Sequence, residues 1–185
     1  MRSIAAVLPG QNSVQTRVAV HFGVIALAIG CMARFGKGAE TVTSIFFVTV
    51  LVILSAIDIE RRILPNVILL PATGVLLVAQ VALFPERALE FVVSGIGAAL
   101  FLLLLVAVNP NGMGMGDVKL ALFLGIGLGT AVGFALLAGA LAAAVFSLGL
   151  ILYHGPAARK MAIPFGPFLA FGAILALFGG SAPFV

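Results

Sequence analysis

The chain has 185 residues, of which 63% are hydrophobic and only 9% are charged, and its formal net charge is +4. A soluble domain carries about 25% charged residues, so this composition excludes an ordinary water-soluble protein and indicates that the solvent is a lipid bilayer. The basic residues are scattered between apolar runs and form no patch, which argues against a nucleic-acid partner. The single cysteine, Cys31, excludes an intrachain disulfide and a multi-cysteine zinc site.

Seven apolar segments follow one another and predict an all-α fold, a polytopic bundle of about six to seven membrane helices. The boundary between the fifth and sixth segments, near residues 127–130, is left open by the sequence. If one helix continued through this region, Gly125, Gly129 and Gly133 would share a face suited to close helix packing. The segments run from Val18 to Met32, Thr43 to Ile57, Val67 to Phe84, Ala88 to Val108, Val118 to Gly129, Ala131 to Tyr153 and Ile163 to Gly179.

The chain shows no internal repeat or low-complexity linker, so we expect one membrane-embedded core over residues 17–185, preceded by a short cytoplasmic segment, residues 1–16. Placing the end of the second segment in the cytoplasm puts seven basic residues inside and three outside, in agreement with the positive-inside rule. The inside residues are Arg2, Arg17, Arg61, Arg62, Lys119, Arg159 and Lys160, and the outside residues are Arg34, Lys37 and Arg87.

Two aspartates stand where a hydrophobic run meets a short polar loop. Asp58 ends the second segment, and Asp117 begins the fifth on the same side of the predicted membrane. A carboxylate at the membrane edge is costly to keep, so each is a functional candidate, although either one alone could equally be a helix cap or a solvated loop charge. Together they predict a paired-carboxylate site of the kind with which aspartyl proteases activate water.

The segments around the two aspartates add further expectations. Glycines at 112, 114 and 116 leave the backbone before Asp117 open to an extended substrate strand. Asn66 is expected to cap the third segment. Asp58 lies at the C-terminal end of its own helix and Asp117 at the N-terminal start of its own, so the helix dipoles predict that Asp58 holds a shared proton more of the time.

Three motifs occur in a fixed order. They are Asp58…Arg62…Pro65-Asn66, then Gly114-Met115-Gly116-Asp117-Val118-Lys119-Leu120, then Ile163-Pro164-Phe165-Gly166-Pro167-Phe168-Leu169-Ala170. From about Arg17 to the C-terminus the chain resembles the prepilin peptidases, integral-membrane aspartyl proteases of the GxGD type. The resemblance implies that Asp58 and Asp117 are the catalytic pair and that no metal or organic cofactor takes part.

The same resemblance implies a substrate and a location. Enzymes of this family cut the basic leader from type IV prepilins and related pseudopilins, usually after a glycine that precedes a hydrophobic segment. They act at the cytoplasmic face of the bacterial inner membrane, in type IV pilus assembly and protein secretion. The partner would therefore be a prepilin or pseudopilin, and the sequence leaves the oligomeric state open.

Eight further residues are expected to bind substrate or to support the pair. Lys119 either tunes Asp117 or reaches to the membrane interface, and Arg62 either contacts Asp58 or sets topology. A break at the start of the seventh segment would help to hold an extended substrate. Glu60, two residues from Asp58, is a rival acid. The eight supporting residues are Gly114, Gly116, Lys119, Arg62, Pro65, Asn66, Pro164 and Gly166.

Longer members of the family add an N-terminal membrane helix and a cysteine-rich cytoplasmic domain, and they methylate the new N-terminus. This chain has only Met1 to Thr16 before its first segment and no cysteine pair. We therefore expect a peptidase core without methyltransferase activity or a methyl-donor cofactor.

Three other readings remain open. The protein could be a non-catalytic component of a pilus or secretion system that uses the aspartates for docking, or an enzyme acting on different membrane substrates. It could also be a small ion-coupled transporter, although such proteins usually show inverted repeats and helices broken at the membrane midplane.

Overall fold

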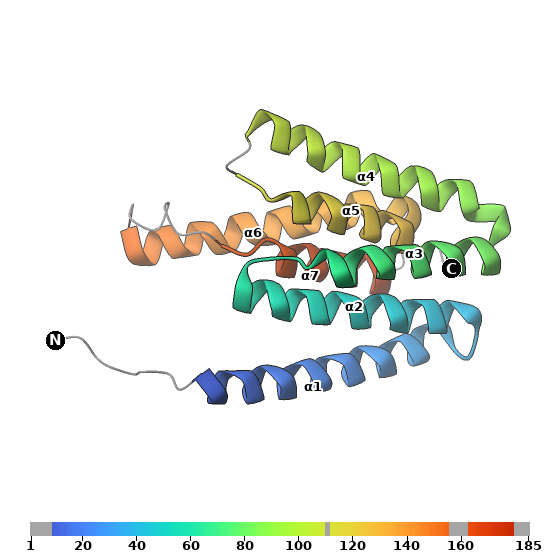
Figure 1. Ribbon diagram of the computed structural model, residues 1–185, viewed down its shortest axis with the longest axis horizontal. Helices are drawn as coiled ribbons and strands as arrows, with labels where there is room; N and C mark the ends of the chain where they lie inside the picture. Colours follow the sequence, from blue (N-terminus) through green and yellow to red (C-terminus); the bar gives the residue numbers. More distant parts are fainter. Residues whose placement is uncertain (1–8, 110–111, 156–162, 180–185) are drawn as a thin grey trace.

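The computed structural model describes residues 9–109, 112–155 and 163–179, and these residues form seven α-helices and two 3₁₀ turns with no strand (Figure 1). The predicted all-α fold is therefore confirmed, and each apolar segment corresponds to one helix. The elements are α1 (Pro9–Phe35), α2 (Ala39–Arg61), α3 (Asn66–Leu83), η1 (Pro85–Arg87), α4 (Ala88–Val108), α5 (Met115–Leu128), η2 (Gly129–Ala131), α6 (Val132–His154) and α7 (Gly166–Phe178).

The boundary that the sequence left open lies at η2. Gly129 has φ +55°, a conformation that glycine adopts readily, and it ends α5. The helix therefore does not continue from Gly125 to Gly133, so the condition for a common face of the three glycines is not met. Gly125 instead packs on α4, where an added Cβ would lie 2.5 Å from Gly95 Cα, whereas a Cβ on Gly133 would meet nothing within 4 Å.

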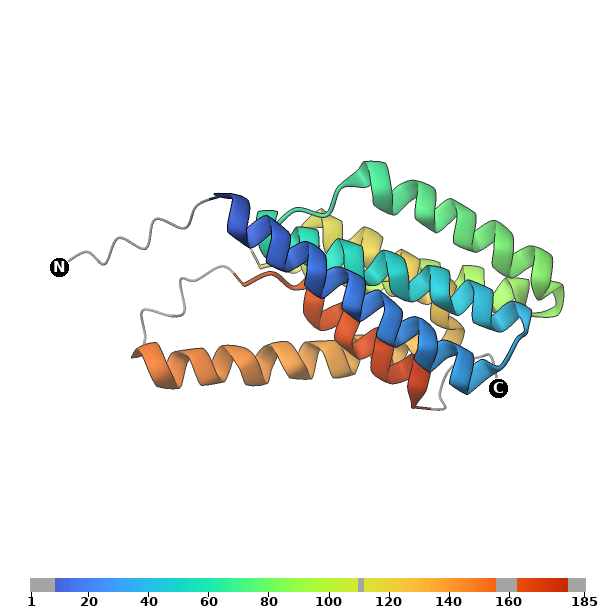
Figure 2. The same ribbon diagram turned by 90° about the horizontal axis from the view of Figure 1, so that it is seen from below.

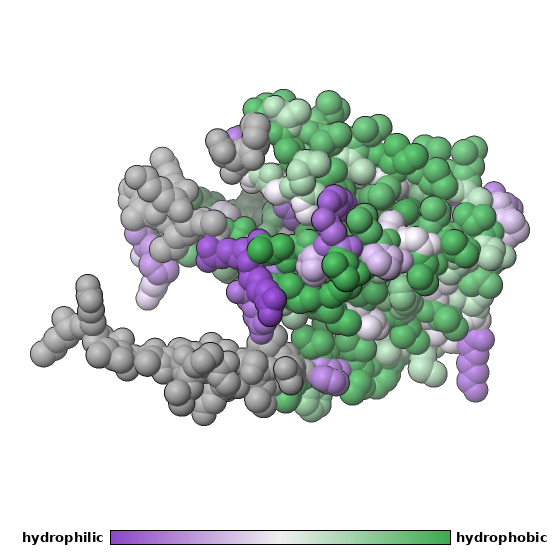
Figure 3. Space-filling view, in the orientation of Figure 1, coloured by the Kyte–Doolittle hydropathy of each residue, from purple (hydrophilic) through white to green (hydrophobic). Residues whose placement is uncertain are grey.

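Apolar side chains cover most of the face of the bundle that Figure 3 shows. Large hydrophobic residues such as Phe22, Val78, Leu104 and Leu152 are exposed on four different helices. Exposing so large an apolar surface to water is unfavourable, whereas exposing it to lipid is not. The described residues contain five stretches long and apolar enough to cross a membrane, so the chain is a multi-pass membrane protein. These stretches are Val18–Phe35, Ala39–Arg61, Asn66–Leu83, Pro85–Val108 and Met115–His154, and Gly166–Phe178 is a shorter apolar helix.

The helices run back and forth between the two ends of the bundle (Figure 1). One end carries the segment between α2 and α3, the start of α5 and the start of α7. The opposite end carries η1, η2 and the turn between α1 and α2. Asp58, Asp117 and Gly166 consequently lie at the same end, although which side of the membrane this end faces stays a prediction. Three of the basic residues used for that prediction, Arg2, Arg159 and Lys160, lie outside the described residues.

The N-terminal helix α1 packs on α2 and leaves much of its remaining surface exposed. It begins at Pro9, so it crosses the division between residues 16 and 17 that the sequence suggested for the membrane core. That division stays a prediction, because residues 1–8 lie outside the described part of the chain.

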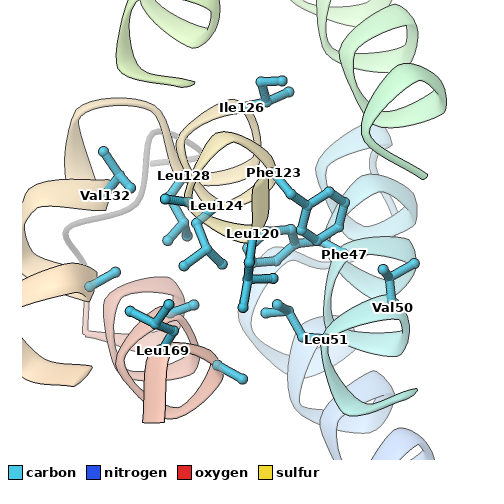
Figure 4. Close-up of a cluster of buried hydrophobic side chains, with 14 of the residues drawn as sticks. Phe47, Val50, Leu51, Leu120, Phe123, Leu124, Ile126, Leu128, Val132 and Leu169 are labelled. Carbon is cyan, nitrogen blue, oxygen red and sulfur yellow. The ribbon is translucent and has the colours of Figure 1, made fainter. Parts of the chain in front are cut away.

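Helix α5 lies at the centre of the bundle and contacts α2, α3, α4 and α7. Its side chains fill the core shown in Figure 4, where Phe123 stacks on Phe47 of α2 with ring centroids 5.2 Å apart. Gly127 lies so close to the same Phe47 ring that an added Cβ would collide with it. At 14 residues, α5 is about 21 Å long, shorter than the ~30 Å hydrocarbon core, and its neighbours enclose it.

The far end of α5 is capped by a buried side chain of α3. Gln80 is fully buried, and its Nε2 donates to the carbonyl oxygens of Ile126 and Gly127, each at 3.4 Å. These carbonyls belong to the last turn of α5, where no later helical N–H is available to them. Gln80 therefore helps to stabilise the end of α5 that lies opposite Asp117.

Candidate active site

Asp58 lies in the last turn of α2 and is only 6% exposed. Its Oδ2 accepts a hydrogen bond from the backbone N–H of Gly166 at 3.0 Å. Gly166 is the first residue of α7, so this N–H has no partner within its own helix and lies at the positive end of the helix dipole. A Cβ on Gly166 would stand 2.7 Å from the same oxygen, so the carboxylate fits here only because residue 166 has no side chain.

Asp117 lies in the first turn of α5 and is 9% exposed. Its Oδ2 accepts the N–H of Gly114 at 3.3 Å, while its own N–H donates to the Gly114 carbonyl oxygen at 3.1 Å. Gly114 is the residue that caps α5, so the two residues satisfy each other as in a capping box. This reciprocal pair holds the carboxylate against the backbone of the glycine-rich loop.

The two carboxylates line one cleft of about 290 Å³ at this end of the bundle. The structure thus brings together the two acids that the sequence placed on different helices. The cleft is also lined by Arg62, Asn66, Gly114, Gly116 and Lys119, all of which the sequence predicted, and by Ile63, Leu64 and Met115, which it did not.

The structure adds a second helix dipole to the argument about which of the two aspartates holds the shared proton. The sequence argument considered only the helix to which each aspartate belongs. In the structure Asp58 faces the N-terminus of α7, while Asp117 sits in the N-terminal turn of α5. Both carboxylates therefore meet the positive end of a helix dipole, and Asp58 in addition lies at the negative, C-terminal end of α2, so which acid holds the shared proton stays a prediction.

Lys119 and Asn66 make a contact that the sequence did not predict. Pro65, and not Asn66, caps α3, since its carbonyl accepts the N–H groups of Ile68 and Leu69. The Asn66 side chain is instead exposed, and its Oδ1 accepts a hydrogen bond from Lys119 Nζ at 2.9 Å. The expected N-cap role of Asn66 is therefore wrong. Among the described residues Lys119 forms no ion pair with Asp117, so its nearest role is to tie the start of α3 to α5.

Arg62 ends α2 and shapes the turn toward α3. It adopts a left-handed backbone conformation, with φ 54° and ψ 36°, and its N–H donates to the Asp58 carbonyl oxygen at 2.8 Å. Two residues on, Leu64 is buried and packs on Gly116, where an added Cβ would lie 3.1 Å from Leu64 Cβ. The only sequence signal for Leu64 was an apolar residue between a charged turn and a proline.

The remaining predicted residues have clear positions. Helix α7 begins at Gly166 with Pro167 in its first turn, so the predicted break before the seventh segment is confirmed. Pro164 lies just before this helix, half-buried, and neither it nor Pro65 lines the cleft. Glu60 is exposed on α2 and also lies outside the cleft lining, which removes it as a structural rival to Asp58. No group of three or more potential metal ligands occurs within the part of the chain that the structure describes.

Comparisons with known proteins give one match. No curated protein and no solved structure is significantly similar to the chain. The model of the type IV leader peptidase family matches residues 45–152, more than half of the chain. This stretch contains both aspartates and the residues of the cleft, and it ends before Gly166. The chain therefore belongs to the type IV leader peptidase family, as the three sequence motifs predicted.

Proposed function

We propose that this protein is a membrane aspartyl endopeptidase that removes the leader peptide from type IV prepilin-like or pseudopilin substrates. The observation that carries the proposal is the shared cleft. Asp58 and Asp117, from two different helices, line it together, and both fall in the stretch that matches a family of leader peptidases. Each carboxylate is buried and held by one backbone N–H, so its position is fixed before substrate arrives.

The chemistry that two such carboxylates perform is general acid–base hydrolysis. One ionised carboxylate takes a proton from water as the water oxygen attacks the scissile carbonyl carbon. The other carboxyl group, protonated at the start, gives its proton to the carbonyl oxygen. Collapse of the tetrahedral intermediate breaks the carbon–nitrogen bond, and a proton passes to the leaving amine. One water is consumed for each new carboxyl and amino terminus.

The position of the cleft suits this reaction. It opens at an end of the bundle, where an unwound peptide strand and water are both available, and a dry membrane centre would offer neither. Gly114 and Gly116 present backbone without side chains beside Asp117, which allows a substrate strand to approach closely. We assign this end to the cytoplasmic face of the bacterial inner membrane, in line with the distribution of basic residues in the sequence.

A gel-shift experiment tests the proposal. The protein is co-expressed with prepilin-like proteins encoded in the same genome, alone and as the Asp58→Asn and Asp117→Asn variants. Glu60→Gln is the matched control, because Glu60 is an acid of the same helix that lies outside the cleft lining. We expect the unsubstituted protein and Glu60→Gln to shorten a prepilin, and both Asp variants to leave it intact. Processing by either Asp variant, at equal membrane yield, would refute the catalytic assignment.

The two non-enzymatic readings predict different results. If the aspartates only dock a partner, substituting them alters assembly of a pilus or secretion complex and leaves processing unchanged. If they carry ions, proton or cation uptake falls in the variants. Transport has less structural support, because both acids lie at helix ends and α2 runs unbroken to the turn that contains Asp58.

A further inference from the structure

An apolar groove of about 540 Å³ lies between α1, α2 and α7, which pass close to one another in Figure 2. The residues that line it on α2, between Val52 and Ile59, have the spacing of one helix face. The residues that line it on α7, between Pro167 and Ile174, have the same spacing. It therefore follows one face of each helix for about two turns, roughly 10 Å. The lining residues are Ala19, Val20, Val52, Ser55, Ala56, Ile59, Pro167, Ala170, Phe171 and Ile174.

One end of the groove lies beside the two residues that form the Asp58–Gly166 hydrogen bond. Asp58 falls between Ala56 and Ile59, both of which line the groove, while its carboxylate lines the cleft. On the other wall Pro167 directly follows Gly166, whose N–H holds that carboxylate. Ile59 and Pro167, which line the groove, are thus the chain neighbours of the two residues joined by the Asp58–Gly166 hydrogen bond. A chain that continued past this end of the groove would pass beside Asp58, which also lines the cleft.

The walls of the groove suit a helix better than an extended strand. Among the residues that the structure describes, Ser55 is the only one lining the groove with a polar side chain, so an extended strand would find few partners for its backbone inside the membrane. An α-helix satisfies its own backbone and needs none. Ala19, Ser55, Ala56 and Ala170 are small, and small residues let a second helix approach closely.

We infer that this groove binds the hydrophobic membrane helix that follows the scissile bond of the substrate, and that it delivers the residues before that helix into the Asp58–Asp117 cleft. The inference rests on the proposed function, since it assigns a binding site to the part of the same substrate that follows the scissile bond. The apolar grooves between α6 and α7 and beside α4 and α6 have no lining residue on α2, the helix that carries Asp58. For this reason we assign the substrate helix to the groove along α1, α2 and α7.

Cysteine cross-linking tests the assignment. Single cysteines are placed at Ile174 in the groove and, as the matched control, at Leu175, its neighbour on α7 that lines the α6–α7 groove instead. Each is made in an Asp117→Asn, Cys31→Ala background and oxidised with a prepilin-like protein carrying single cysteines along its apolar segment. Disulfides form only between Cα atoms within about 7 Å. We expect cross-links at Ile174→Cys with a three-to-four-residue periodicity and none at Leu175→Cys.

Obstructing the groove supplies a kinetic readout. Ala19 is exposed at the edge of the groove, so Ala19→Phe fills part of it without entering the core. We expect KM for the membrane substrate to rise about tenfold, while cleavage of a short peptide that lacks the apolar segment is unchanged. Ala144→Phe, an exposed alanine of α6 outside the groove lining, should leave both activities unchanged.

The outcomes separate the inference from the proposed function. Suppose that the unsubstituted protein cleaves the substrate. Cross-links at Leu175→Cys but not at Ile174→Cys then overturn the groove assignment, and so do equal effects of Ala19→Phe on the membrane substrate and the short peptide. Either result leaves the proposed protease function intact. Failure of the unsubstituted protein to cleave any prepilin-like protein overturns the proposed function, and the inference with it. Cleavage together with cross-links at Ile174→Cys supports both.

Discussion

The backbone N–H of Gly166 donates a hydrogen bond to Asp58 Oδ2 at 3.0 Å and so joins the start of α7 to the end of α2, 108 residues apart in the sequence. This contact gives a precise role to a proline-flanked glycine that lies beyond the stretch matched by the family. It orients one candidate catalytic carboxylate by the end of a helix that carries no acid of its own.

Replacing Gly166 by alanine tests this role. The added Cβ would lie 2.7 Å from Asp58 Oδ2, so either the carboxylate or the start of α7 must move. We expect leader cleavage to fall by about 100-fold, the effect of a misplacement near 1 Å, with the protein still folded. Gly149→Ala is the control, because a Cβ on Gly149 in α6 meets nothing within 4 Å. Cleavage rates and melting temperatures in detergent give the answer, and full activity of Gly166→Ala would contradict the role.

The Lys119–Asn66 hydrogen bond predicts a coupling between α3 and α5. Lys119→Met and Asn66→Ala each remove one partner of the 2.9 Å contact. Because the contact is exposed, each change should lower the free energy of unfolding by only about 0.5–1.5 kcal/mol. The double variant should be less destabilised than the sum of the two, with a coupling of about 0.5 kcal/mol or more in a double-mutant cycle. Strict additivity would show that the contact does not form.

The packing of α7 against α6 depends on Gly172. A Cβ at this position would collide with the carbonyl oxygen of Ala135 and approach Gly139 N to 2.6 Å, both on α6. Gly172→Ala should therefore destabilise the protein by about 1–3 kcal/mol and reduce cleavage, since α7 also holds Asp58. Gly97→Ala on α4, where a Cβ meets nothing within 4 Å, should leave both unchanged. Equal unfolding curves for the two variants would argue against this helix contact.

The capping of α5 by Gln80 can be tested at a position far from the two aspartates. Gln80→Leu leaves the carbonyls of Ile126 and Gly127 without the side-chain donor that caps α5. We expect a loss of about 1–3 kcal/mol in the free energy of unfolding, measured by chemical denaturation in micelles. Because Gln80 lies at the end of the bundle opposite the cleft, kcat/KM of the folded fraction should not change. A stabilised Gln80→Leu protein would show that the buried amide is not a cap.

The helices and the pair of acids could be predicted from the sequence because their signals are local. Runs of apolar residues show where helices lie, and the loops around Asp58 and Asp117 show that both acids fall at helix ends. Alternation of the helices across the membrane then puts both acids at one end of the bundle. The family motifs supplied the remaining step, since periodicity alone cannot bring two helices side by side.

The contacts that hold the site could not be predicted, because they join residues far apart in the chain. Nothing near Asp58 indicates that its partner is the N–H of Gly166, and nothing near Gln80 indicates the end of α5. The common face of Gly125, Gly129 and Gly133, which required one continuous helix, is absent for a related reason. Equal spacing from Gly125 to Gly133 predicts a shared face only while one helix continues, and the positive φ of Gly129 ends it.

The central claim is that Asp58 and Asp117 act as one catalytic unit. The most direct test measures leader cleavage by purified protein for Asp58→Asn, Asp117→Asn and the double variant. If the two carboxylates share one reaction, each single variant and the double variant should fall to the same background rate, since a unit that lacks either member fails completely. If one single variant retains substantial activity, or the losses multiply in the double variant, the two residues act separately and the paired-carboxylate account is wrong.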